Sequence, residues 1–187
     1  LAGVNFQNAT FAKCIFSETF SDGMSVDFSP DGQIIATGSN DKTVKLWKLD
    51  GTLVKTLTGH DYGVRAVAFS PNAQEIASAN DNIIKLWTLD GKLLKTFKGP
   101  RNSGKGFNLT PDKGLYTEFF SESGISFSPD GQVIATGGLD GTVRLWKQDG
   151  KMILLAGHSD IISDFSFSPD SKTIATASRD KTFKLWK

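Results

Sequence analysis

The chain has 187 residues, 39% of them hydrophobic, which allows one substantial core or an array of small units that share one. Its 21 basic and 20 acidic residues leave a formal net charge of +1, so it has no electrostatic footprint for nucleic acid or a membrane surface. The one cysteine, Cys14, excludes an internal disulfide and a multi-cysteine zinc site and fits a reducing compartment, which predicts a cytoplasmic location.

Residues 1–22 form a predicted leader with a rhythm of its own. Large apolar residues recur there every five positions, at Leu1, Phe6, Phe11 and Phe16. This spacing resembles the pentapeptide repeats that coil into a square β-helix, and the leader holds at most one turn of it; an ordinary strand is the alternative. No signal-like segment opens the chain, and because it begins with Leu rather than Met, we expect it to be an excerpt of a longer protein.

Rare residues recur in register over the rest of the chain. Each of the four tryptophans follows a leucine, at Trp47, Trp87, Trp146 and Trp186, and four prolines follow a Phe-Ser pair, at Pro30, Pro71, Pro129 and Pro169. The distance from that Phe to the Trp is 19, 18, 19 and 19 residues, and successive tryptophans are 40, 59 and 40 residues apart. The spacing predicts a repeat protein with a period near 40 residues and one insertion.

Short strands are predicted inside each repeat. In the first repeat the apolar residues fall in four short runs, at residues 26–28, 34–36, 44–47 and 53–57, which are typical of strands. An Asp-Gly pair precedes the fourth run and readily takes the positive φ angles of a tight hairpin, at Asp50-Gly51, Asp90-Gly91 and Asp149-Gly150. Each repeat is therefore predicted to be a four-stranded antiparallel meander with two apolar faces, which must stack on neighbours.

These motifs resemble those of WD-repeat β-propeller proteins over about residues 23–187. The resemblance rests on the period, the Phe-Ser-Pro-Asp-Gly turn, the Gly-His pairs at His60 and His158, and the closing Leu-Trp, although Asp never follows the Trp. It implies an all-β chain whose four meanders are propeller blades, with an insertion at about 99–121. The expected blades span about residues 23–58, 61–98, 122–156 and 160–187.

The resemblance also bears on ring closure and origin. Propellers of this kind commonly have about seven blades, so four repeats indicate an arc of a larger ring, and the last repeat stops at Lys187 before its fourth strand. The alternative is a small ring that another segment closes, for which residues 13–18 offer a strand. A pentapeptide-like leader followed by WD repeats is similar to modular signalling proteins of filamentous bacteria, especially cyanobacteria.

The insertion contains a near match to a phosphate-binding loop at residues 99–106. Gly106 stands where a hydroxyl would bind magnesium, and an all-β chain lacks the strand–loop–helix frame of such a loop. We therefore expect a surface loop rather than a nucleotide site.

Two sets of residues have the composition of a hydrolytic triad. In the family that the chain resembles, however, the histidine, a strand-two hydroxyl, the hairpin Asp and the strand-three Trp form a buried hydrogen-bonded network. The sequence repeats the set, always with Asp six residues before Trp, which favours a structural role in each repeat over a single active site. We therefore expect no catalytic residue and no enzyme. The expected members are His60, Ser78, Asp81 and Trp87; His158, Thr176, Asp180 and Trp186; and, where Thr19 and Glu118 replace the histidine, Thr37, Asp41 and Trp47 and Thr136, Asp140 and Trp146.

Metal and cofactor sites are not indicated. The two histidines lie 98 residues apart and Cys14 adds no ligand spacing, so we expect no metal, no cofactor and no small-molecule substrate. The longest unbroken apolar run, residues 152–156, is far too short to span a bilayer. Basic residues precede each Leu-Trp pair and are interpreted as a solvated strand face, at Lys45, Lys85, Arg144 and Lys184.

The resemblance implies a rigid, non-catalytic scaffold for protein–protein interaction. Partners would bind the loops that join strand four to the next strand one, and strand two to strand three. Tyr62 and Arg179 are the predicted anchors, because Tyr and Arg are enriched at the energetic centres of interfaces. The other candidates are Asp61, Asn80, Leu139, Ser159 and Asp160. One alternative is the sensor or regulatory tail of a larger signalling ATPase or protease; nucleic-acid binding is a third reading, which the charge balance disfavours.

Overall fold

The structure is a computed structural model that describes residues 23–80, 83–99 and 124–187. The described residues contain fifteen β-strands and no helix. The strands are β1 (Gly23–Phe28), β2 (Ile34–Ser39), β3 (Val44–Lys48), β4 (Leu53–Leu57), β5 (Ala66–Phe69), β6 (Glu75–Asn80), β7 (Ile83–Thr88), β8 (Leu93–Lys98), β9 (Gly124–Phe127), β10 (Val133–Gly137), β11 (Thr142–Lys147), β12 (Met152–Ala156), β13 (Ile162–Phe167), β14 (Ile174–Ser178) and β15 (Phe183–Trp186).

The strands form four separate antiparallel sheets in chain order. Three sheets have four strands each, β1-β2-β3-β4, β5-β6-β7-β8 and β9-β10-β11-β12, and the last has three, β13-β14-β15. The last sheet ends after its third strand, as the position of Lys187 within its repeat predicted. The all-β class and the meander topology are thus confirmed. The leader, including residues 13–18, and the insertion beyond Gly99 lie outside the described residues.

Two recurrent turns build each meander. In the turn from β1 to β2, the Ser29 hydroxyl bonds to Asp31 Oδ1 at 2.6 Å, and the same oxygen accepts the N–H of Gln33 at 3.1 Å. The last three sheets repeat the Ser–Asx bond at 2.6–2.7 Å. In the hairpins that precede the fourth strands, the glycines predicted to need a left-handed backbone have φ of 86°, 94° and 92°, at Gly51, Gly91 and Gly150.

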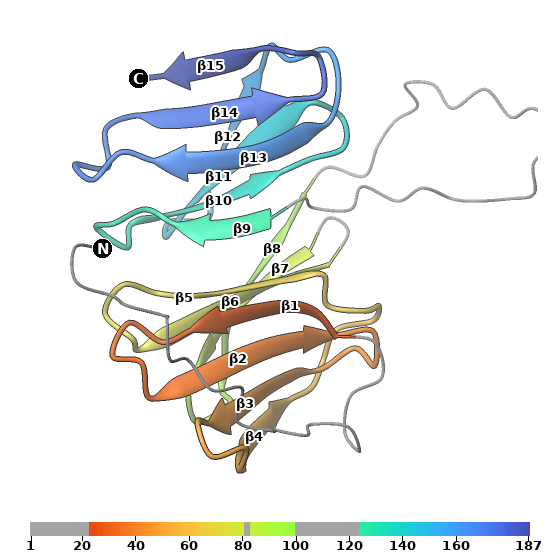
Figure 1. Ribbon diagram of the computed structural model, residues 1–187, viewed down its shortest axis with the longest axis vertical. Helices are drawn as coiled ribbons and strands as arrows, with labels where there is room; N and C mark the ends of the chain where they lie inside the picture. The colour runs from red at the N-terminus through yellow and green to blue at the C-terminus, as the bar shows by residue number, and fades with distance from the viewer. Residues whose placement is uncertain (1–22, 81–82, 100–123) are drawn as a thin grey trace, which may run out of the picture.

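The sheets stack face to face into an open arc (Figure 1). We call the face of a sheet that looks toward the preceding sheet its front face, and the opposite one its rear face. At the first junction the rear face of β1–β4 buries aliphatic residues against the front face of β5–β8, which supplies Val67, Phe69, Ile76 and Trp87. Small and aliphatic residues of β5–β8 likewise cover Phe127, Ile134 and Trp146 at the second junction. At the third, Ala135 and Val143 pack with Ile162 and Ile174.

We expect the junctions to carry most of the stability of the arc. Phe69 is 6% exposed and packs across the first junction, so Phe69→Ala should lower the free energy of unfolding by about 3–5 kcal/mol. Leu94 on β8 is 42% exposed, and Leu94→Ala should change it by less than about 1 kcal/mol. Urea unfolding followed by tryptophan fluorescence measures both. Equal losses in the two variants would contradict a core located between the sheets.

Candidate partner-binding surface

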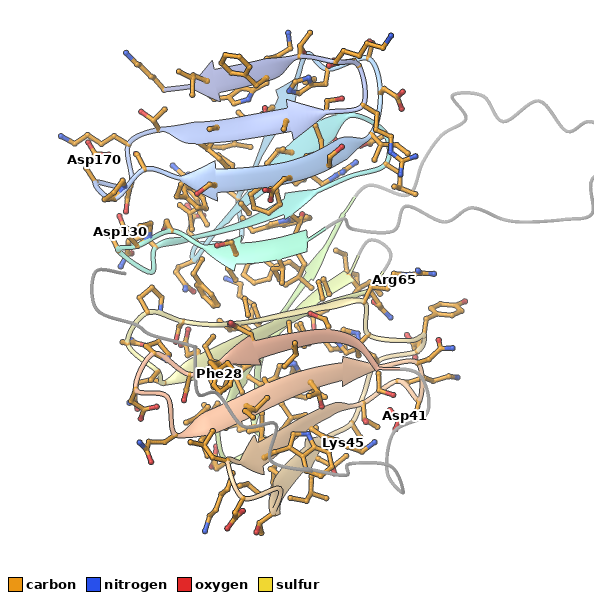
Figure 2. The ribbon with its side chains drawn as sticks, in the orientation of Figure 1. Phe28, Asp41, Lys45, Arg65, Asp130 and Asp170 are labelled. Atoms are coloured by element: carbon orange, nitrogen blue, oxygen red, sulfur yellow. The ribbon has the colours of Figure 1, made fainter. Side chains whose placement is uncertain are left out.

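The arc has two edges that carry different connections. Figure 2 shows Asp130 and Asp170, from the turns that follow β9 and β13, on one edge, and Asp41 and Arg65 on the opposite edge. We call the first the turn rim. The second, the loop rim, is formed by the β2–β3, β10–β11 and β14–β15 hairpins, the end of β6 at Asn80 and the connections into β5 and β13. All the predicted partner-binding residues lie in the sequence segments that form the loop rim.

The fourth sheet brings one predicted polar set together completely, just beneath the loop rim. The Trp186 indole N–H donates to Thr176 Oγ1 at 3.0 Å, and that hydroxyl lies 2.8 Å from His158 Nε2. His158 Nδ1 lies 2.8 Å from Asp180 Oδ2, which also accepts the N–H of Ser159 at 3.0 Å. Hydrogen bonds from the Thr182 hydroxyl, the Ser159 N–H and His158 hold the pKa of Asp180 below its ordinary value. Both ring nitrogens of His158 therefore have a hydrogen-bond partner.

This arrangement has the connectivity of a hydrolytic triad but not its accessibility. Thr176 is 2% exposed, and its oxygen already accepts the indole hydrogen. A nucleophile must reach a substrate and must lie beside donors for the oxyanion. The trio therefore links strands β14 and β15 with the loop before β13, and its hydroxyl is shielded from solvent.

The second sheet holds an incomplete version of the same network. Ser78 Oγ lies 2.7 Å from His60 Nε2 and accepts the Trp87 indole N–H at 2.8 Å. Asp81 lies outside the described residues. His60 Nδ1 and Asn80 Oδ1 are buried, and neither has a hydrogen-bond partner among the described residues. Burial lowers the pKa of His60 to about 4, against a weaker opposing effect of Asn80, so the imidazole is neutral at pH 7.

In the first and third sheets, which lack the histidine, a cation pairs with the hairpin aspartate. Lys45 Nζ bonds to Asp41, and Arg144 Nη2 bonds to Asp140 Oδ2 at 2.5 Å. Although burial opposes ionisation of both carboxyl groups, these hydrogen bonds lower the pKa of each below its ordinary value. Arg144 is only 6% exposed, so its interpretation as part of a solvated strand face is wrong. The sequence did contain a signal for this ion pair, an Asp four residues before the Arg, but the Arg was interpreted as a surface charge.

Tyr62 stands on a loop that is bonded to both sheets of the first junction. The N–H of Val64 donates to Ser39 O at 2.9 Å, and Asn80 Nδ2 donates to Tyr62 O at 3.3 Å. The Tyr62 side chain is 58% exposed, and Asp61 beside it is also exposed. Asn80 is only 1% exposed, so the prediction that its side chain contacts a partner is wrong. It supports the Tyr62 loop from below instead.

Arg179 belongs to a second group of loop-rim residues at the fourth sheet. Its N–H donates to Ile161 O at 2.9 Å, and the neighbouring Ser178 hydroxyl donates to Asp160 O at 2.8 Å. The β14–β15 hairpin is thereby fastened to the connection that enters β13. Arg179, Ser159 and Asp160 are exposed, and Leu139 of the preceding hairpin is half-buried. Tyr62 and Arg179 therefore lie on different sheets, each on a braced loop.

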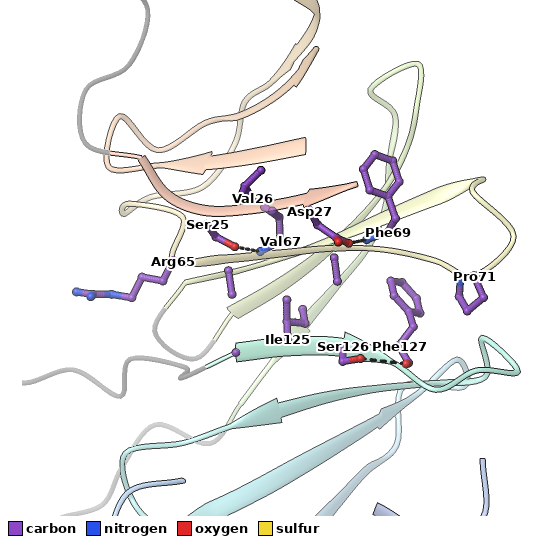
Figure 3. Close-up of a pocket in the computed structure, with 13 residues that line it drawn as sticks. Ser25, Val26, Asp27, Arg65, Val67, Phe69, Pro71, Ile125, Ser126 and Phe127 are labelled. Carbon is purple, nitrogen blue, oxygen red and sulfur yellow. Dashed lines mark hydrogen bonds between the residues drawn. The ribbon is translucent and has the colours of Figure 1, made fainter. Parts of the chain in front are cut away.

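A groove along the inner strands was not predicted from the sequence. Its volume is about 450 Å³, and β1, β5 and β9 line it (Figure 3). Across it Ser25 Oγ accepts the N–H of Val67 at 3.1 Å, and Asp27 Oδ2 accepts that of Phe69 at 2.7 Å. Burial raises the pKa of Asp27 despite these bonds. Both side chains bind the neighbouring strand, a role that depends on sheet stacking and has no sequence signature.

Two further searches covered only the described residues. They contain no helix that is long and apolar enough to cross a membrane. Within the same residues, no three His, Cys, Asp or Glu side chains are grouped so that they could hold a metal ion.

A family model for the WD domain, G-beta repeat (WD40), matches residues 13–48, 51–88, 123–147 and 151–187, well over half of the chain. The chain belongs to the WD40 repeat family. Each sheet of the structure is thus a WD40 blade, and the resemblance found in the sequence is confirmed for the repeats. The family explains why indole, hydroxyl and hairpin aspartate recur at fixed spacing in every blade.

Short segments of the chain are similar to fungal nuclear distribution proteins. The nuclear distribution protein PAC1 of Mycosarcoma maydis is 54% identical over 48 residues, which cover 25% of this chain and 11% of that protein. PAC1 of Tuber melanosporum is 56% identical over 46 residues, 25% of this chain and 10% of that protein. Nuclear distribution protein nudF of Aspergillus terreus is 48% identical over 50 residues, 27% of this chain and 11% of that protein. The chain thus covers about a tenth of the length of these relatives.

The complete network of the fourth blade should contribute measurably to stability. Thr176→Val keeps the shape of the side chain but leaves the Trp186 N–H and His158 Nε2 without their partner, so we expect a loss of about 2–4 kcal/mol in the free energy of unfolding. Thr52→Val, at an exposed hairpin position, should cost less than about 0.5 kcal/mol. Chemical denaturation compares the two, and a Thr176 variant as stable as the Thr52 variant would refute the bracing role.

His60 should make the protein less stable in mild acid. Its pKa is near 4 in the folded state and near 6.5 when unfolded, so between these values the unfolded chain binds a proton that the folded chain does not. Stability should be complete above about pH 6.5 and fall by about 2–3 kcal/mol at pH 4.5. Urea titrations of wild type and His60→Gln at pH 7 and 4.5 isolate this contribution. Identical pH dependence in the two proteins would contradict it.

Proposed function

We propose that this chain is a non-catalytic protein-interaction scaffold whose loop rim binds a protein partner through Tyr62 and Arg179. The observation that carries the proposal is the bracing of both loops. The backbone beside Tyr62 is bonded to the preceding blade, and that of Arg179 to the connection into its own blade. Exposed Tyr and Arg side chains on preorganised loops lose little conformational freedom on binding, which favours them as anchors.

The contacts of the polar groups support binding over catalysis. The triad-like residues of the fourth blade bond to one another beneath the surface, and Arg144 and Lys45 are paired with aspartates. Two of the four basic residues in this row are therefore neutralised by a neighbouring carboxylate, which weakens the case for a cationic stripe of the kind that neutralises phosphates. No described residue favours the alternative of a sensory tail on an ATPase or protease over a general scaffold.

The comparisons support the scaffold class without identifying a partner. The similarity to nuclear distribution proteins covers about a quarter of this chain and about a tenth of those proteins, so it supports the repeat architecture of a scaffold and we take no partner from it. A cytoplasmic location, which the single cysteine predicted, is part of the proposal. The pentapeptide-like leader and the bacterial resemblance remain predictions, and the relatives named above are fungal.

The proposal predicts that partner capture depends on the loop rim. Tyr62→Ala combined with Arg179→Ala should reduce the amount of specific partner protein that a tagged chain captures from lysate by about tenfold or more. The reason is that truncation of a hot-spot residue costs about 2 kcal/mol or more of binding free energy. The matched control is Gln33→Ala with Gln132→Ala, two exposed residues of the turn rim. Affinity purification with quantitative mass spectrometry measures the capture. Equal capture by the loop-rim variant and wild type would show that the assigned rim is wrong.

A further inference from the structure

The outer edge of the third sheet differs from the outer edges of the two sheets before it. Each of these edges is a fourth strand, and among the described residues β12 pairs only with β11. Val54 in β4 and Leu94 in β8 are extra residues in the strand register, and a lysine follows each, Lys55 and Lys95. Bulges and lysines keep an edge from pairing with another chain. β12 has a regular register, with Ile153 at the position of those lysines.

The main chain of β12 presents a regular row of donors and acceptors along this edge. The N–H of Lys147 donates to Lys151 O at 2.9 Å and closes the hairpin between β11 and β12. Because bonded and non-bonded pairs alternate in an antiparallel ladder, the N–H and C=O groups of Met152, Leu154 and Ala156 point away from β11. Main-chain groups in this pattern can pair with one further extended strand.

The side chains beside this row are apolar and exposed. Met152 is 36% exposed and Leu154 is 48% exposed. They lie opposite Trp146 and Arg144 on the front face, which looks toward the complete second sheet, so their exposure does not depend on the three-stranded fourth sheet. In β8 the position of Leu154 is occupied by Thr96. The third sheet therefore has an apolar contact where its neighbour has a polar one.

The charge along this edge is concentrated at one end. β12 itself carries no charged residue. Lys147 and Lys151 are exposed at the hairpin end, where Asp149 lies 3.5 Å from Lys151 Nζ and balances one of the two cations. Opposite charges on adjacent strands attract. A segment that runs antiparallel to β12 would therefore be favoured by an acidic residue at its C-terminal end.

We propose that the outer edge of β12 binds an extended, largely apolar segment of a partner protein. The segment adds to the sheet as an antiparallel fifth strand, with an acidic residue near its C-terminal end beside Lys147 and Lys151. A five-residue edge is short for an interface between two folded chains, which buries about 1,200–2,000 Å² in total, but it suits a peptide that binds through main-chain hydrogen bonds. This site uses a strand edge and not the loops of the loop rim.

A synthetic peptide tests the proposal on the full chain. The probe is an acetylated peptide of about eight residues, the length of an ordinary strand, that alternates Val and Thr and ends in Glu. NMR spectra of the labelled protein should show saturable shifts of the Met152, Leu154 and Ala156 amides. Replacement of the Glu by Lys in the peptide should weaken binding at least about twofold.

Methylation of the peptide nitrogens separates strand addition from simple apolar adhesion. N-methyl groups on the residues whose N–H groups face β12 should abolish binding, because they remove the main-chain bonds to the edge. The same groups on the alternate residues should leave the affinity within about twofold of the parent peptide. This comparison leaves the protein unchanged, so a misfolded variant cannot produce the difference.

Two matched variants place the peptide on β12. Leu154→Lys should weaken binding about tenfold or more, because it gives this edge the lysine that β4 and β8 carry. Leu94→Lys, at an exposed position on the bulged edge of β8, should bind as wild type does. Absence of saturable shifts at the three β12 amides, or binding that N-methylation leaves unchanged, would overturn the proposal. Self-association of the free chain through the same amides would assign the edge to a second copy and overturn it as well.

Discussion

The packing of one sheet on another is the interaction on which this structure depends. Each blade has apolar residues on both faces, so a single blade leaves one or both faces in water. The aromatic front of each internal blade, exemplified by Phe69 and Trp87, is buried by aliphatic residues of the blade before it. Hydrogen bonds within a sheet define a blade, but its stability comes from its neighbours. The stability of a blade therefore depends more on the blades packed against it than on the hydrogen bonds within its own sheet.

The polar networks show which part of a repeat is fixed and which part varies. In all four blades the indole N–H of the third strand donates to a hydroxyl of the second strand, at 2.8–3.1 Å. The remaining acceptor, the hairpin aspartate, is satisfied by His158 in one blade and by Lys45 or Arg144 in two others. A buried donor must be paired in every blade, whereas a carboxylate accepts any cation or imidazole within reach. The first and third blades, which lack the histidine, therefore still have a paired hairpin aspartate.

The repeat, the strands and the hairpin glycines could be predicted from the sequence because each reflects a local rule. Spacing between Phe-Ser-Pro and Leu-Trp sets the meander, and positive φ explains Gly51. The burial of Asn80, the pairing of Arg144 and the bridge from Asp27 to β5 could not be predicted, because they depend on which side chain of the next sheet comes within reach. Asn and Arg side chains are exposed in most proteins, so Asn80 and Arg144 were predicted to be exposed. The packing of one sheet on the next buries or pairs them instead.

The same junctions that stabilise the arc also position its binding loops. The N–H of Val64 bonds to Ser39 O of the preceding blade, and the N–H of Ile162 bonds to Gly138 O in the same way, at 2.9 and 3.2 Å. Both of these loops are therefore held by two sheets, so a change at either junction would move a loop as well as a core.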